Sequence, residues 1–454
     1  MAQKPSIPKG TRDFSPLEME RRNYIFSTIT DVYRKYGYKQ IETPAMENLS
    51  TLMGKYGDEG DKLLFKILNS GDFLSKVDKE TLEAGDYKKL ISRIAEKGLR
   101  YDLTVPFARY IVQHRNEITF PFKRFQIQPV WRADRPQRGR YREFFQCDSD
   151  VIGSKSLLNE VELVQIIDEV FTKLGIKVII RLNNRKILAG IADAMGYPEK
   201  LTAITVALDK IDKIGQENVM NEIESLGVGK DALSLFETIV NLNDNDTATK
   251  FNCLKEIIGE TEAGAKGIFE MKEIFELTEP LNISNEVKFD LSLARGLNYY
   301  TGTIFEVVAA DVKMGSICGG GRYDDLTGIF GLKDMSGVGV SFGADRIYDV
   351  LNELEAFPPS VAAGTRVMLV NFGETEARFA LGMIEKIRAK GISAELYPDA
   401  VKLKKQMNYA DKNNIAYVLM VGKDEIDTGI FTLKDMENGE QKKLSFEQII
   451  DILR

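Results

Sequence analysis

The stretch VWRADRPQRGRYREFFQCDSD, residues 130–150, places five arginines within eleven positions of a chain whose net charge is −7. It continues an alternating segment, and the PQRG sequence within it is typical of a turn. Two segments of period 2 joined by a short polar loop form an antiparallel hairpin, which we predict over residues 122–133 and 140–152. Guanidinium groups stay charged at any working pH and bind flat, multi-oxygen anions. The hairpin is therefore predicted to hold an anion.

One face of the second strand carries its polar groups in a definite order. Side chains two positions apart share a face. The residues predicted on this face are Arg140, Arg142, Phe144, Gln146, Asp148 and Asp150. Two cations, an aromatic ring, an amide and two carboxylates suit an elongated ligand, with phosphates at the arginine end and a donor-rich group at the other. The alternative interpretation is a solvated surface hairpin.

The rest of the chain is predicted to be an α+β protein with a separate C-terminal domain. Residues 19–36 and 154–174 have helical periodicity, and residues 38–43 read as a short strand. Strand signals return at residues 286–293 and 299–308, and a βαβαβ pattern follows the linker. The predicted divisions are a core in two parts (1–183 and 285–355), a mostly helical insertion (184–284), a linker (356–365) and a C-terminal α/β domain (366–454).

Composition narrows the function classes. A chain of 454 residues with 43% hydrophobic and 28% charged residues is typical of a globular protein. No apolar run approaches the ~18 residues of a membrane span, and the N-terminus lacks the apolar stretch of a signal peptide. We therefore expect a cytoplasmic protein without a membrane partner. The three cysteines lie far apart, and the single histidine, His114, excludes a histidine-rich metal site.

Four further motifs have both a structural and a functional interpretation. RYDLT (residues 100–104) precedes a helix that Thr104 could cap. The glycines of CGGGRYDDLTG (residues 318–328) allow a close backbone approach, or only a loose turn. GVGVSFGADR places Arg346 at a helix start, where it could bind phosphate or pair with Asp349. Neither standard glycine loop for nucleotides is present, so a nucleotide would bind through side chains on a sheet.

Together these segments resemble the histidyl-tRNA synthetases, a family of class II aminoacyl-tRNA synthetases, over nearly the whole chain. Three segments are similar to the class motifs: YGYKQIETPAMENLSTL (residues 36–52), VWRADRPQRGRYREFFQCD (residues 130–148) and GVGVSFGADRI (residues 337–347). LRYDLTVPFARY (residues 99–110) and LARGLNYY (residues 293–300) are similar to motifs of the histidine enzyme, which are more specific. The chain departs from the family at Asn298, where an aspartate is usual, and this puts any structural role of that carboxylate in doubt.

The resemblance implies a class II fold: an antiparallel sheet with flanking helices, a helical insertion, and a C-terminal anticodon-binding-like domain. The ATP-binding residues that it implies are Arg132, Asp134, Arg140, Arg142, Phe144 and Arg346. The histidine-binding residues that it implies are Asp102, Thr104, Arg132, Gln146, Asp150, Arg295, Tyr299, Tyr300 and Tyr323. Arg295 and Arg132 would be catalytic, and the loop around Gln137 would face the tRNA acceptor end.

In detail, Arg132 would hold the α-phosphate, Arg140 the outer phosphates, and Phe144 would stack the adenine against Arg346. Asp150 and Tyr300 would read the two imidazole nitrogens, which explains carboxylates beyond the arginines. The implied reaction activates L-histidine with ATP and transfers it to tRNA(His). The reaction does not need a protein nucleophile. It needs the two anions to be aligned and their charge to be neutralised, which arginines and Mg²⁺ can do. The metal ligands stay unassigned, and the first motif implies a homodimer.

Two alternatives belong to other classes. One is a catalytically silent paralogue such as the regulatory subunit of ATP phosphoribosyltransferase, although such chains lack the C-terminal domain and lose motif residues. The other is a tRNA-binding or sensing module without activity. Histidine-dependent pyrophosphate exchange separates both from an active enzyme.

Overall fold

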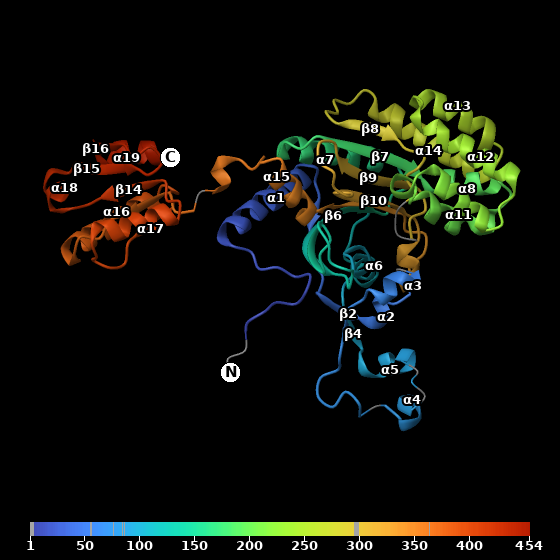
Figure 1. Cartoon of the computed structure of the whole chain (residues 1–454), viewed down its shortest axis with the longest axis horizontal. Coiled ribbons are helices and arrows are strands. Elements are labelled where there is room, and N and C mark those ends of the chain that lie inside the picture. The colour runs from blue at the N-terminus through green and yellow to red at the C-terminus, as the bar shows by residue number, and fades with distance from the viewer. Residues whose placement is uncertain are drawn as a thin grey trace. The chain divides into compact units, whose positions relative to one another are not determined.

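The computed structural model describes residues 4–54, 57–75, 77–83, 85, 87–294, 299–362 and 364–454. The chain forms two compact units, one built mainly of Arg22–Ala356 and the other mainly of Phe357–Arg454. Figure 1 shows the elements of each unit. Each unit has its own sheet, so each is described by itself below.

An eight-stranded sheet forms the centre of the first unit. Its strands, in spatial order, are β1 (Lys39–Gln40), β5 (Phe122–Trp131), β6 (Glu143–Ile152), β11 (Gly337–Gly343), β10 (Cys318–Tyr323), β9 (Thr303–Ala309), β7 (Val178–Asn184) and β8 (Glu286–Phe289). The predicted antiparallel sheet is mixed, because the pairs β1–β5 and β7–β8 at its two edges are parallel. From β5 to β7 every neighbouring pair is antiparallel.

Three amphipathic helices, α1 (Pro16–Lys35), α7 (Leu158–Leu174) and α15 (Ala344–Glu353), flank this sheet. In α1, Ile25, Ile29 and Val32 are fully or almost fully buried, as the helical spacing predicts. α7 ends at Gly175, whose φ of 70° is the left-handed conformation that favours glycine at a helix end. A fourth helix, α6 (Thr104–Gln113), packs Phe107 and Ile111 against side chains of β6 and β10.

A small three-stranded sheet, in the order β2 (Met46–Asn48), β4 (Lys97–Leu99), β3 (Lys66–Ile67), belongs to the same unit. Short helices accompany it: α2 (Leu49–Leu52), α3 (Gly57–Lys62), α4 (Lys79–Glu83) and α5 (Tyr87–Ile94). Leu52 and Leu64 pack with Val105 of α6 in one apolar cluster, which connects this part of the unit to α6.

The chain between β7 and β8 is helical, as predicted, and packs beside that edge of the sheet (Figure 1). Its α-helices are α8 (Arg185–Ala194), α9 (Leu201–Leu208), α10 (Ile211–Ile214), α11 (Gln216–Ser225), α12 (Lys230–Asn241), α13 (Thr247–Ile258) and α14 (Glu262–Thr278). Gly190 lets α8 and α14 approach closely, because a Cβ there would lie 2.6 Å from the Cα of Gly264. The 3-10 helices of the first unit are η1 (Pro198–Lys200), η2 (Leu242–Asp244) and η3 (Leu326–Phe330).

The second unit has a five-stranded sheet in the order β13 (Ala394–Leu396), β12 (Val367–Leu369), β14 (Tyr417–Met420), β15 (Phe431–Asp435), β16 (Gln441–Leu444). The first three strands are parallel, as the βαβαβ pattern predicts, and the last two are antiparallel additions. Its helices are η4 (Pro359–Ala362), α16 (Glu374–Arg388), α17 (Leu403–Lys412), α18 (Lys423–Thr428) and α19 (Phe446–Leu453).

Candidate active site

The predicted hairpin is present, and its second strand is shorter than expected. β5 pairs antiparallel with β6, with Arg124 opposite Asp150 and Gln128 opposite Gln146. β6 begins only at Glu143. Gly139 has a φ of 68°, and a bridge between Gln137 and Arg140 closes the loop. The shared face therefore runs from Phe144 to Asp150, and Arg140 and Arg142 reach the hairpin from its loop.

A cavity of about 380 Å³ lies at the arginine end of this face. Five of the six predicted ATP-binding residues line it, together with Gln146: Arg132, Asp134, Arg140, Phe144 and Arg346. The structure thus brings together side chains from β6, from its loop and from the start of α15, which lie more than 200 positions apart in sequence. A pocket with this lining suits an aromatic base next to an oxyanion.

Arg132 and Arg346 are held in place before any ligand arrives. The Nε of Arg132 donates to the Tyr101 carbonyl at 3.1 Å, and its guanidinium lies 4.3 Å from the Tyr101 ring centre. The Nε of Arg346 donates to the Gly139 carbonyl at 2.8 Å. Asp349, the alternative partner predicted for Arg346, accepts a hydrogen bond from the Tyr141 hydroxyl at 3.0 Å. Such preorganisation lowers the cost of aligning a charged ligand.

Arg142 and Gln137 lie apart from the large cavity. Arg142 does not line it: its backbone N–H donates to the Gly10 carbonyl and its Nε to the Asp134 carbonyl, at 2.8 and 3.0 Å. It therefore fixes the N-terminal segment and the loop. Gln137 is exposed on the hairpin loop, where a large partner can reach it.

A second, much smaller cavity of about 20 Å³ lies at the carboxylate end. Four predicted histidine-binding residues line it: Thr104, Asp150, Tyr300 and Tyr323. Gly319 and Ser341 line both cavities, so the two adjoin. Gln146 lies between them, lining the large cavity while its Nε2 donates to the Ser341 hydroxyl at 2.8 Å.

Asp148 and Asp150 are buried carboxylates whose pKa values burial raises, in the case of Asp148 to about 7. The positive charge of Arg124 acts in the opposite direction on both. The Tyr323 hydroxyl donates to Asp150 Oδ1 at 2.8 Å. Burial also raises the pKa of Tyr300, so its hydroxyl stays a donor at neutral pH.

Asp102 has a structural contact as well as a predicted binding role. Its Oδ1 accepts the backbone N–H of Val105 at 3.1 Å, at the start of α6, and the Tyr299 hydroxyl lies 3.3 Å from its Oδ2. The interpretation of Thr104 as the helix cap is wrong, because Thr104 is the first residue of the helix and Asp102 provides the capping carboxylate. Thr104 is thus left to face the small cavity.

The glycines of CGGGRYDDLTG form strand β10 rather than a loose turn, and they permit close approaches. A Cβ on Gly321 would lie 2.8 Å from the Tyr300 ring, and one on Gly320 would lie 2.0 Å from the Gly339 carbonyl oxygen. On the neighbouring strand, a Cβ on Gly339 would lie 2.1 Å from Asp150 Oδ1. Glycine at these positions therefore makes room for the two side chains predicted to read imidazole.

Two buried charged residues at the site escaped the sequence interpretation. Asp345 accepts hydrogen bonds from Arg12, from Arg22 at 2.5 Å and from the Phe145 backbone at 2.8 Å, and so connects α1, β6 and α15. Arg124 is fully buried, with its Nη2 2.7 Å from Asp150 Oδ2. The register across the hairpin is the only signal that could have placed Arg124 beside Asp150.

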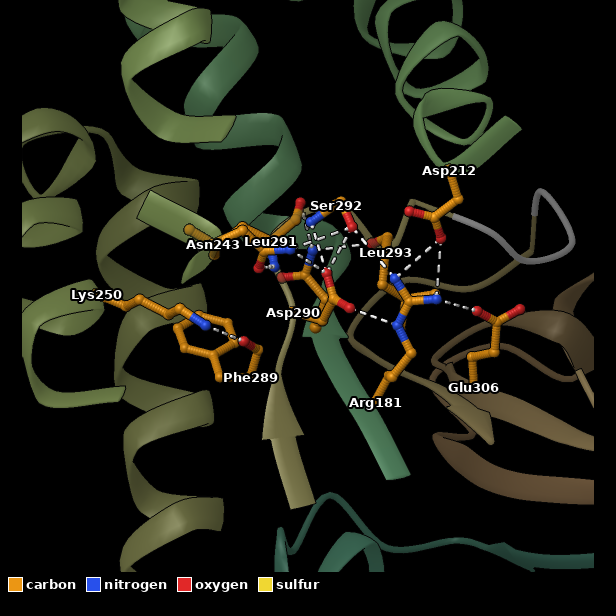
Figure 2. Close-up of polar contacts among 11 residues, drawn as sticks. Arg181, Asp212, Asn243, Lys250, Phe289, Asp290, Leu291, Ser292, Leu293 and Glu306 are labelled. Carbon is orange, nitrogen blue, oxygen red and sulfur yellow. Dashed lines mark hydrogen bonds and ion pairs between the residues drawn. The ribbon is translucent and has the colours of Figure 1, made fainter. Parts of the chain in front are cut away.

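Arg295, predicted as catalytic, lies outside the described residues, and so does Asn298. The segment just before them is held from two sides, as Figure 2 shows. From the helical insertion, Asn243 Nδ2 donates to Asp290 Oδ1 at 2.9 Å. From β7, Arg181 pairs with Asp290 and with Glu306 of β9. Asn183 Nδ2 donates to the Leu293 carbonyl at 2.8 Å.

Replacing Asp290 with asparagine is expected to lower the free energy of unfolding by ~3 kcal/mol near neutral pH, since a buried pair loses one partner. Burial alone would raise the pKa of Asp290, but Arg181 and hydrogen bonds from Ser292 and Asn243 hold it below its ordinary value. This stability is present above about pH 4 and is lost as pH falls through the lowered pKa. Urea unfolding over a pH series should show the difference in unfolding free energy between the two proteins shrinking in acid.

The control is Lys210→Met, which breaks the half-exposed pair with Glu222. It should lower the free energy of unfolding by under about 1 kcal/mol.

Two features are absent from the described residues. No group of three or more histidine, cysteine, aspartate or glutamate side chains among them is arranged to hold a metal ion. None of the helices in that part of the chain combines the length and the apolar character that crossing a membrane requires.

Comparison with known proteins shows the family of the chain. The family described as histidyl-tRNA synthetase matches residues 10–76 and 80–347, and the anticodon binding domain matches residues 366–454. A protein of Bacteroides fragilis named histidine–tRNA ligase is 59% identical over 453 residues, covering 100% of both chains. The crystal structure of histidyl-tRNA synthetase from Nostoc sp. PCC 7120 superposes with a TM-score of 0.85 at 29% identity, covering 100% of this chain and 99% of that one.

The fold is that of a class II aminoacyl-tRNA synthetase, which confirms the predicted fold class. Within that class, the chain belongs to the histidyl-tRNA synthetase family. An ATP phosphoribosyltransferase regulatory subunit/histidyl-tRNA synthetase from Bacillus halodurans shares the fold at 21% identity and a TM-score of 0.71, covering 89% of this chain and 97% of that one. The fold alone therefore does not separate a histidyl-tRNA synthetase from a regulatory subunit of this kind.

Proposed function

We propose that this protein charges tRNA(His) with L-histidine in two steps. A histidine carboxylate oxygen first attacks the α-phosphorus of ATP, forming histidyl-adenylate as pyrophosphate leaves. A hydroxyl at the 3′ end of the tRNA then attacks the activated carbonyl, and AMP leaves. The observation that carries this proposal is the pair of adjoining cavities, one rich in arginine and one lined by carboxylates and tyrosines.

The large cavity is proposed to bind ATP. Arg132 holds the α-phosphate, Arg140 the outer phosphates, and the adenine lies between Phe144 and the Arg346 guanidinium. The lining of the cavity supports these four roles. It does not support a contact of Arg142 with ATP. Arg295 is proposed to bridge the histidine carboxylate and the α-phosphate, on the strength of its place in LARGLNYY.

The carboxylate end of the shared face, where the small cavity adjoins the large one, is proposed to bind the imidazole of histidine. Asp150 accepts its N–H, and the Tyr300 hydroxyl donates to the other ring nitrogen. Tyr323 lines the small cavity, whereas Tyr299 lies outside its lining, with its hydroxyl 3.3 Å from Asp102 Oδ2. Asp102, Thr104 and Gln146 are proposed to bind the α-amino group; Thr104 lines the small cavity and Gln146 the large one, whereas Asp102 lines neither. Both nitrogens of the ring are thus matched, so an amino acid without them leaves buried polar groups unpaired.

Mg²⁺ is proposed to accompany ATP. It prefers oxygen ligands, retains waters and commonly binds substrate phosphates with only one or two carboxylates. The large cavity fits this, because the carboxylate of Asp134 lines it, with its Oδ1 3.8 Å from Arg140 Nη1. Mg²⁺ would neutralise charge on the outgoing pyrophosphate.

The C-terminal unit and the helical insertion are proposed to bind tRNA, at the anticodon and the acceptor arm respectively, and Gln137 faces the acceptor end. A chain ending near Ala356 is expected to keep pyrophosphate exchange within about threefold and to lose most tRNA charging. The physical reason is that the C-terminal unit carries its own core and sheet. Charging of tRNA with labelled histidine tests the whole proposal. Equal loss of both reactions in a truncated chain with a cooperative melt would contradict the division of roles.

We also propose that two copies form a homodimer and that the protein works in the cytoplasm, where its tRNA substrate is found. Exposed apolar side chains around the three-stranded sheet support a second copy as partner: Met46, Met53, Leu68, Phe73 and Leu74. Light scattering should give twice the chain mass of 51.1 kDa, and a monomer mass would contradict the dimer.

A further inference from the structure

Arg124 of β5 lies behind the small cavity rather than in its lining. It stands opposite Asp150 in the hairpin register and is 0% exposed. Its Nη2 lies 2.7 Å from Asp150 Oδ2 and 3.8 Å from Asp148 Oδ2. On its other side, the guanidinium lies 4.2 Å from the centre of the Phe107 ring. One buried cation therefore serves two buried carboxylates.

Burying this ion pair is unfavourable for the free energy of folding. The nitrogens Nε, Nη1 and Nη2 of Arg124 find no aligned hydrogen-bond acceptor within the described residues, so the link to Asp150 is an ion pair alone. Replacing such a buried pair with apolar side chains is often neutral or stabilising. Packing thus gives no reason for an arginine here, and the reason has to lie in what the cation does to its neighbours.

The neighbour that needs a cation is Asp150. Burial favours its neutral form, and the Arg124 charge opposes that effect. A neutral carboxyl group would turn one oxygen into a donor, whereas an ionised carboxylate only accepts. Asp150 Oδ1 already accepts from Tyr323 at 2.8 Å, and Oδ2 faces Arg124. Both contacts fix the direction of the carboxylate while leaving it acceptor capacity toward the cavity.

We propose that Arg124 is a positioning residue that keeps Asp150 ionised and turned toward the small cavity, so that Asp150 accepts the N–H of a neutral imidazole. This inference rests on the proposed function. Arg124 does not touch the amino acid. It acts through Asp150 and thereby sets the selectivity of the pocket for a ring that donates at that position.

The test measures ATP–pyrophosphate exchange and histidine binding by calorimetry in Arg124→Met and Arg124→Lys. Arg124→Met is expected to raise the KM for histidine by on the order of 10²-fold, because the acceptor loses its fixed charge, and to leave the KM for ATP within about twofold. Arg124→Lys should recover part of the loss, since it restores the charge without the planar fork. The control is Arg109→Met on α6, which breaks the half-buried pair with Glu47, 2.6 Å away, outside both cavities, and should leave the KM for histidine unchanged.

A double-mutant cycle separates positioning from a general structural role. In an Asp150→Asn background, where position 150 carries no charge for Arg124 to hold, adding Arg124→Met should change the KM for histidine by less than about threefold. The same large increase in both backgrounds would overturn the proposal, and so would an equal rise in the KM for ATP. Melting curves check folding, and if Arg124→Met does not fold, Arg124→Lys takes its place in the cycle. A wild-type protein that neither binds nor activates histidine overturns the proposed function and this inference together, whereas an active wild type with no effect at Arg124 overturns only the inference.

Discussion

Replacing Asp150 with alanine is expected to lower kcat/KM for histidine by on the order of 10⁴-fold in pyrophosphate exchange, with the KM for ATP nearly unchanged. A site built to hydrogen-bond a polar group discriminates by this factor when the bond is lost. Asp150 is buried, lines the small cavity and has its carboxylate fixed by Tyr323 and Arg124. Its removal also deprives the buried Arg124 of its nearer carboxylate and leaves only Asp148, 3.8 Å away, so a melting curve must accompany the kinetics.

A matched control comes from the same strand. Glu143 at the start of β6 is exposed, and its carboxylate accepts from Trp131 Nε1 at 2.9 Å. Glu143→Ala should change kcat/KM for histidine by less than about twofold, as surface substitutions usually have small effects. Wild-type efficiency in folded Asp150→Ala would remove Asp150 from imidazole recognition and return the carboxylate to a structural role.

Replacing Arg132 with alanine is expected to slow the formation of histidyl-adenylate by ~10²–10³-fold, or ~3–4 kcal/mol of transition-state stabilisation. Arg132 lines the large cavity, and the Tyr101 carbonyl and ring hold its guanidinium in place. A fixed cation at the α-phosphate gains most in energy as charge builds up on the pentavalent phosphorus. Rapid-quench measurement of adenylate formation gives the rate directly.

The effect is expected to depend on the position of Arg132 and not on the number of arginines in the hairpin. Arg138 belongs to the same hairpin loop, but its side chain is 68% exposed and pairs with Glu353. Arg138→Ala should therefore leave adenylate formation within about twofold of wild type. Lysine at position 132 should rescue poorly, because it cannot stack on Tyr101 and present a planar fork at once. Equal rates for the Arg132→Ala and Arg138→Ala proteins would contradict the assignment.

Periodicity predicted the parts of the fold whose pattern is local. Alternation placed β5 and β6, helical spacing placed α1, and the βαβ pattern placed the parallel strands of the C-terminal unit. It did not predict β10, because three glycines at Gly319–Gly321 weaken strand propensity. Their strand is stabilised by pairing with β9 and β11, and the glycines are required by Tyr300 and Gly339. These close contacts form only in the folded protein, so the sequence pattern does not predict the strand.

The same limit explains the site. Phe144, Gln146 and Asp150 were predictable because they alternate on one strand. Arg142 looks like another member of that face, yet the turn at Gly139 delays the strand and leaves Arg142 against Gly10. Arg124 shares its residue type with the exposed arginines of the loop, and only the cross-strand register reveals that it faces Asp150. The positions of Arg124 and Arg142 therefore follow from contacts in the folded protein, and residue type and spacing do not predict them.

The central claim is most directly tested by ATP–pyrophosphate exchange with each of the twenty amino acids in turn. The adjoining cavities predict exchange with histidine, and rates for the other nineteen that are lower by on the order of 10⁴ or more where both ring nitrogens are missing. Exchange that requires no amino acid, or that proceeds equally with an amino acid other than histidine, would contradict the assignment of the small cavity to imidazole.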